Sequence, residues 1–124
     1  MKEVSFIDTF QHQEHRKWLS TLDFYQDEIK IFQHELLQVL HRHPNLLGII
    51  EHVDEYRRIF LKKLEHIDDF RHRIILHERA LVSDQISSIT ESRDHSEARE
   101  EIFQFFKDFE TLKGNFRRFV AHNN

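Results

Sequence analysis

Residues 15–39 read HRKWLSTLDFYQDEIKIFQHELLQV, and their apolar and aromatic side chains recur in alternating steps of three and four positions. Such steps place one stripe along one face of an α-helix and are typical of helices that pack nearly in line. Two later stretches of the chain repeat the pattern. The stripe positions are His15, Trp18, Leu22, Tyr25, Ile29, Phe32, Leu36 and Val39; then Leu46, Ile49, Val53, Tyr56, Phe60, Ile67, Phe70 and Ile74; then Ala98, Ile102, Phe105, Phe109, Leu112, Phe116 and Phe119.

The 124-residue chain contains only two glycines and one proline, too few for the turns of a β-rich fold of this size. We therefore predict an all-α protein with one domain, residues 1–124, folded as an antiparallel three-helix bundle with long, coiled-coil-like helices. The expected helices span about 8–42, 45–91 and 95–121. Pro44 separates the first two, because proline cannot continue a helix and disfavours helical geometry at the residue before it.

The boundary between the second and third helices is marked less sharply. The apolar stripe drifts after Leu81, so the second helix either continues to about residue 91 or breaks near Ser83. Continuity is the favoured interpretation. Asp94 is then the expected N-cap of the third helix, since Glu97 follows at the spacing of a capping box.

The charge pattern excludes several classes of function. The formal net charge is −4 and both signs are interleaved, so the chain lacks the concentrated positive surface that nucleic acid requires. Without cysteine it has neither disulfides nor thiolate chemistry. No apolar run approaches the roughly 20 residues of a membrane span, and the N-terminal residues do not resemble a signal peptide. A cytoplasmic protein is the default expectation.

Several apolar residues lie off the stripes and predict a contact surface. Phe24 and Ile31 in the first helix and Phe103 and Phe106 in the third would remain partly exposed in a three-helix core. Extra apolar positions of this kind favour a further helix, most simply from a second copy of the chain. We therefore expect a homodimer that acts as a module for self-assembly or protein–protein interaction. No phosphate-binding loop or nucleophile elbow indicates an enzyme, and no cofactor is expected.

Eleven histidines raise an alternative, a metal-binding bundle. No histidine follows a glutamate by three positions, and none precedes a glutamate or histidine by four, which argues against a di-iron site of the ferritin or hemerythrin kind. If Val39 packs opposite Leu46, the antiparallel register places Glu14 beside Arg73. The same register gathers a different group of histidines and carboxylates near one end of the bundle. Mixed imidazole and carboxylate ligands suit zinc or iron. The residues of this candidate site are Asp8, His12, His15, His77 and Glu78.

The histidines also allow a pH-sensing role, since their ordinary pKa near 6.5 would add eleven positive charges as the pH falls through that range. Histidines at stripe positions, such as His15, would then oppose folding or assembly once protonated. The simpler interpretation is that most of them are solvated surface residues.

Overall fold

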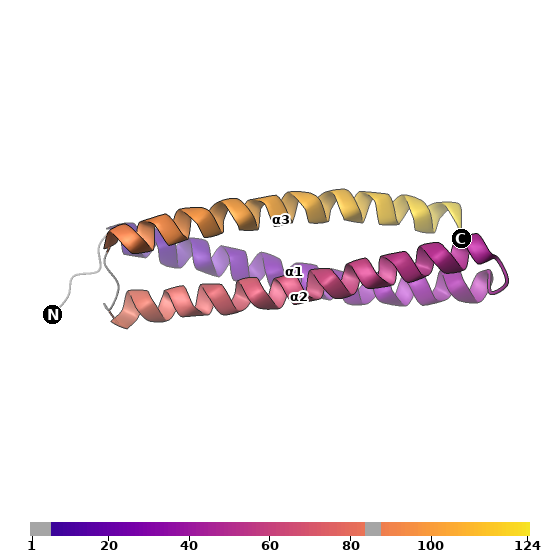
Figure 1. Ribbon diagram of the computed structural model, residues 1–124, viewed down its shortest axis with the longest axis horizontal. Helices are drawn as coiled ribbons and strands as arrows, with labels where there is room; N and C mark the ends of the chain where they lie inside the picture. Colours follow the sequence, from indigo (N-terminus) through magenta and orange to yellow (C-terminus); the bar gives the residue numbers. More distant parts are fainter. Residues whose placement is uncertain (1–5, 84–87) are drawn as a thin grey trace.

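The protein is an all-α, antiparallel three-helix bundle, as the sequence predicts (Figure 1). The computed structural model describes the backbone of residues 6–83 and 88–124 and the side chains of residues 9–80 and 94–124. Helix α1 spans Phe6–Arg42, α2 spans Leu47–Ser83 and α3 spans Ser88–His122. α1 and α3 run in the same direction and α2 runs back between their ends (Figure 1). One end of the bundle therefore brings together the start of α1, the end of α2 and the start of α3.

The boundary between α2 and α3 differs from the expected one. α2 ends at Ser83 rather than near residue 91, and α3 begins at Ser88 rather than near residue 95. Ser83, where the alternative interpretation placed a break, is the last residue of α2. Residues 84–87 lie outside the described residues. The prediction that Asp94 caps a helix is wrong, because Asp94 lies inside α3, more than one turn after its start. The residues after Asp94 are therefore fully helical and can present side chains to the bundle interior.

The predicted stripes form the core. Every position of the first stripe is buried, and those of the third are buried or half-buried. Leu46, which the register placed opposite Val39, is instead 54% exposed because it lies in the turn before α2. The middle of the core is aromatic: Phe60 packs edge-on against Phe116, with ring centroids 5.0 Å apart. The fully buried side chains include Leu22, Ile29, Val39, Phe60, Ile67, Phe109 and Phe116.

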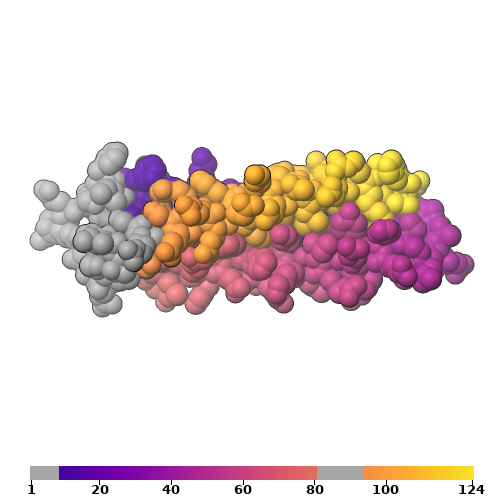
Figure 2. Space-filling view, turned by 45° about the horizontal axis from the view of Figure 1, so that its top comes forward, coloured from indigo at the N-terminus to yellow at the C-terminus, as the bar shows by residue number. Residues whose placement is uncertain are grey.

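Polar pairs fix α3 along α1. Lys113 of α3 lies 2.7 Å from the buried carboxylate of Glu28, and the Tyr25 hydroxyl donates a 3.0 Å hydrogen bond to Glu110. A third pair, Glu14 with Arg99, lies near the end where the chain enters α1. The described part of the chain forms an elongated body in which α3 also lies along α2 (Figure 2). Within that part, none of the helices combines the length and apolar character needed to cross a membrane.

Candidate metal centre

Three histidines, one from each helix, meet inside the end of the bundle where α1 and α3 begin and α2 ends. They are His15 of α1, His77 of α2 and His95 of α3, and one ring nitrogen from each lies within 4.8 Å of the other two. The ring centroid of His15 is 5.0 Å from that of His95 and 6.0 Å from that of His77. Each histidine occupies an inward-facing helical position, so the packing of the helices assembles the group.

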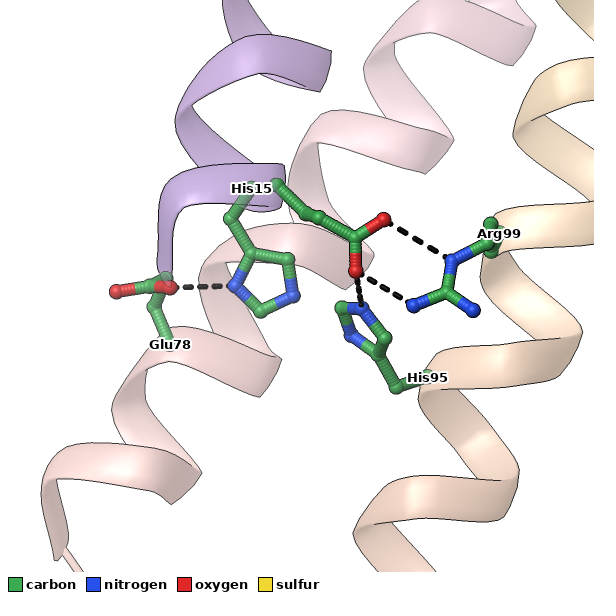
Figure 3. A network of polar contacts seen from close by, with 5 residues as sticks. His15, Glu78, His95 and Arg99 are labelled. Atoms are coloured by element: carbon green, nitrogen blue, oxygen red, sulfur yellow. Dashed lines mark hydrogen bonds and ion pairs between the residues drawn. The ribbon is translucent and has the colours of Figure 1, made fainter. Parts of the chain in front are cut away.

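His15 has one ring nitrogen engaged and the other free. Its side chain is 1% exposed, and its Nδ1 is hydrogen-bonded to a carboxylate oxygen of Glu78 on α2 (Figure 3). Because a carboxylate only accepts, this bond places the proton of the neutral ring on Nδ1. The lone pair of Nε2 therefore points into the protein interior. Among the described residues this buried atom has no hydrogen-bond partner.

His95 has the same arrangement with the roles of its two nitrogens exchanged. Its side chain is 3% exposed, and its Nε2 donates a 2.8 Å hydrogen bond to Oε1 of Glu14. Arg99 holds the same carboxylate with two bonds, of 2.6 Å to Oε1 and 3.0 Å to Oε2. Nδ1 of His95 is buried, unprotonated and without a hydrogen-bond partner in the part of the chain that the structure describes. Figure 3 shows His15 and His95 next to each other, with Glu78 on the outer side of His15 and Arg99 beside His95.

The surroundings favour the ionised form of Glu14 and the neutral form of His15 and His77. Burial raises the pKa of Glu14, but the hydrogen bonds from Arg99 and His95 outweigh it and leave the pKa below its usual value. Burial lowers the pKa of His15 and of His77. Neutral imidazole is the form that binds a metal ion. At neutral pH, protons therefore compete only weakly for these two rings.

The aromatic surroundings hold the rings in position. Trp18 stacks on His95, with centroids 5.0 Å apart and an angle of 24° between the ring planes. It also lies 5.6 Å from the ring of His15. His77, by contrast, is only half-buried. Trp18 thus covers His95, whereas His77 is the most exposed of the three histidines.

This geometry has the features of a histidine metal site. Metal-bound histidines commonly donate their second ring N–H to a carboxylate, which fixes the tautomer and orients the ring. His15 with Glu78 and His95 with Glu14 have this arrangement. In a tetrahedral site with metal–nitrogen bonds of about 2.1 Å, the ligand nitrogens lie about 3.4 Å apart. Nitrogens within 4.8 Å of one another need only small side-chain rotations to reach that spacing.

The structure brings together part of the predicted metal site and adds residues that sequence reasoning missed. His15 and His77 lie in the cluster, whereas His12 lies beside it and donates from Nδ1 to Glu78 over 2.6 Å. Glu78 faces the far side of the His15 ring instead of joining the ligand group. The side chain of Asp8 lies outside the described residues.

The missed residues are His95, Glu14 and Arg99. The predicted pair of Glu14 with Arg73 is not formed: α3 supplies the partners of Glu14, and Arg73 binds Glu101 instead. One signal in the sequence does mark His95. It lies three residues before Ala98 and so extends the third apolar stripe by one step towards the N-terminus. Because Asp94 was predicted to be the N-cap of the helix, His95 was not assigned to the stripe.

The residues predicted to form an interface lie on α1 and α3. Phe24, Ile31 and Phe103 are 56%, 57% and 52% exposed. Phe106 is half-buried, because it packs against the core and meets Tyr25 edge-on at 5.5 Å. A groove of about 440 Å³ between the two helices is lined by Phe10, Gln13, Glu14, Lys17, Trp18, Thr21, Phe103 and Phe106.

Comparisons with protein-family models, curated proteins and solved structures found no match to this chain. The geometry of the histidine cluster and of the exposed apolar face is therefore the evidence on function.

Proposed function

We propose that the protein is a metal-binding helical bundle in which His15, His77 and His95 bind one divalent transition-metal ion. One observation carries the proposal. One ring nitrogen from each of the three histidines belongs to a single close group, Nε2 of His15 and Nδ1 of His95 are buried without a hydrogen-bond partner among the described residues, and a carboxylate is bonded to the other nitrogen of each of these two rings. A buried polar atom without a partner costs about 1–3 kcal/mol, and a bound metal ion would remove that cost at both atoms.

Zinc fits this donor set better than iron does. Three imidazole nitrogens are borderline ligands that suit zinc, copper or nickel, whereas magnesium and calcium prefer oxygen. Non-haem iron is typically bound by two histidines and one carboxylate. Here the carboxylates of Glu14 and Glu78 hold the outer nitrogens of the rings and are not members of the ligand group. The donor set therefore favours zinc over iron.

The test is a zinc titration of untagged protein, read by calorimetry and by elemental analysis after dialysis. We expect one zinc ion per chain. The variant His15→Ala/His77→Ala/His95→Ala should lose that site, since it removes all three donors. A matched variant, His41→Ala/His72→Ala/His122→Ala, removes one exposed histidine from each helix and should bind as the native chain does.

Circular dichroism checks that both variants are helical. If the first variant fails to fold, His77→Ala alone replaces it, because His77 is half-buried and its truncation disturbs the core least. Equal zinc binding by the ligand variant and the matched variant would contradict the proposal, as would the absence of stoichiometric binding by the native chain.

The exposed apolar face supports a second function, self-assembly. Phe103 lines the groove between α1 and α3, and Lys113 of α3 lies over the ring of Phe24. Ile31 follows Phe24 by one heptad and so lies on the same face of α1. Large exposed apolar patches commonly mark protein–protein contacts. We propose that a second copy of the chain packs its own α1 and α3 against this face, which would extend the bundle to more helices.

Light scattering coupled to size exclusion measures the mass in solution. The native chain should elute at twice its 15.3 kDa mass, and Phe24→Glu/Phe103→Glu should be a folded monomer. As a control, Leu61→Glu/Leu76→Glu charges similarly exposed positions on α2 and should leave the dimer intact. A monomeric native chain at tens of micromolar would refute this second function.

A further inference from the structure

The histidine cluster offers fewer donors than a closed metal site requires. Structural zinc sites in proteins have four protein ligands, whereas sites with three protein ligands keep the fourth position for water or substrate. Among the side chains that the structure describes, the group of mutually close donor atoms has three members, one from each helix. A metal bound there in tetrahedral geometry therefore has one position left over.

The neighbouring carboxylates are committed elsewhere. Glu78 accepts hydrogen bonds from His12 and His15, and Glu14 accepts from His95 and Arg99. Glu78 is bonded to Nδ1 of His15 (Figure 3) and Glu14 to Nε2 of His95, whereas the nitrogens without a partner are the other one of each ring. Neither can take the fourth position without releasing the ring that it orients. Among the described residues, these two carboxylates therefore do not supply the fourth ligand.

The three histidines differ in exposure. His15 and His95 are almost fully buried and Trp18 stacks on His95, but His77 on α2 is half-buried. Of the three rings, His77 is therefore the one that a small molecule in the solvent can reach.

Charge determines which kind of small molecule fits. Three neutral imidazoles leave the full charge of a divalent ion uncompensated by its ligands. Arg99 neutralises Glu14, so that carboxylate adds little negative charge to the site. Glu78, which is shared by two histidines, and Asp94, whose charge acts on His77, are the other nearby acidic groups. The three ligands themselves stay uncharged, so an anionic fourth ligand would be held directly by the charge of the metal ion.

We propose that the metal centre has an exchangeable fourth position, open past His77, that binds a small monodentate anion such as hydroxide. This inference rests on the proposed metal binding by His15, His77 and His95. The centre then belongs with metal sites that have one replaceable ligand and whose bound water ionises near neutral pH. It does not belong with structural sites, in which four protein ligands close the metal.

Cobalt(II) provides the test, because it substitutes for zinc and its visible absorption reports coordination. The full-length protein is titrated with cobalt(II) chloride, and sodium azide is then added as the probe anion. We expect one equivalent of cobalt(II) to give the intense visible bands of a tetrahedral site. Azide should then shift these bands in a saturable way, with the metal retained on dialysis.

Two variants separate the possible outcomes. His77→Ala should abolish the tetrahedral bands, whereas His72→Ala, an exposed histidine on the same helix, should leave both the bands and the azide shift unchanged. Bands that are absent, or unaffected by His77→Ala, would refute the proposed metal site itself. Bands that depend on His77 but do not respond to excess azide would leave metal binding intact and overturn the open position. In that case a protein side chain would fill the fourth position of the metal. Asp94, whose charge acts on His77, is the first candidate, and Asp94→Asn tests it.

Discussion

Phe60→Ala is expected to lower the free energy of unfolding by about 3–5 kcal/mol, a typical cost for truncating a buried phenylalanine. Phe60 is fully buried at the middle of the bundle and contacts one aromatic ring from each of the other two helices. Its ring centroid is 5.8 Å from that of Phe32 in α1 and 5.0 Å from that of Phe116 in α3. Alanine would leave a cavity where all three helices meet, and closely packed helices can close it only in part. Urea unfolding followed by circular dichroism measures the loss.

The matched control is Leu61→Ala, the truncation of a large apolar side chain of α2 that is 49% exposed and lies outside the proposed self-assembly face. It should cost less than about 1 kcal/mol, since surface substitutions rarely have large effects and alanine is the better helix former. Similar losses for the two variants would contradict the position of Phe60 in the core. If Phe60→Ala does not fold, Phe60→Leu makes the same comparison with a smaller cavity.

Glu14→Gln is expected to weaken zinc binding by about 10- to 100-fold, the usual effect of removing a carboxylate that orients a metal-bound histidine. The glutamine amide can still accept a bond from Nε2 of His95, so the ring retains a partner. It carries no charge, however, and it can no longer accept both bonds from Arg99. The imidazole becomes less basic and less firmly oriented, and both changes reduce its affinity for the metal. Competition with a coloured chelator at pH 7.5 measures the zinc dissociation constant.

Glu110→Gln is the control for this substitution. Glu110 is an exposed carboxylate on α3 that accepts a hydrogen bond from Tyr25, well along the helix from the histidine cluster. It should bind zinc as tightly as the native chain. An unchanged dissociation constant for Glu14→Gln, with helical content preserved, would show that Glu14 does not orient a metal ligand.

The sequence predicts this fold well because the fold follows from periodicity. Trp18, Leu22 and Ile29 recur at heptad spacing, and such a stripe has to be buried against another helix. The scarcity of glycine and proline left few alternatives to three long helices. The end of α2 was harder to place, because no strong helix-breaking residue marks it and the stripe drifts after Leu81.

The site was only partly predictable, because it depends on how the third helix lies against the first. The register of α1 against α2 that was guessed from Pro44 placed Asp8 opposite His77, whereas in the structure His15, one heptad later in α1, contacts His77. No comparable turn fixes α3 against α1, so the partners of Glu14 could not be derived. His95 contributes because α3 begins before Asp94, which continues the inward-facing stripe by one more step. Hydrogen bonds between side chains on different helices leave no spacing pattern in a single sequence.

The most direct test of metal binding at the histidine cluster is an anomalous difference map, measured at the zinc absorption edge, from crystals grown with one equivalent of zinc. We expect a single strong peak within bonding distance, about 2.0–2.1 Å, of Nε2 of His15, Nδ1 of His95 and a ring nitrogen of His77. Glu78 and Glu14 should still hold the opposite nitrogens of His15 and His95. Zinc found only at exposed histidines such as His41 or His122, with the space between the three buried rings lacking a peak, would contradict the proposed function.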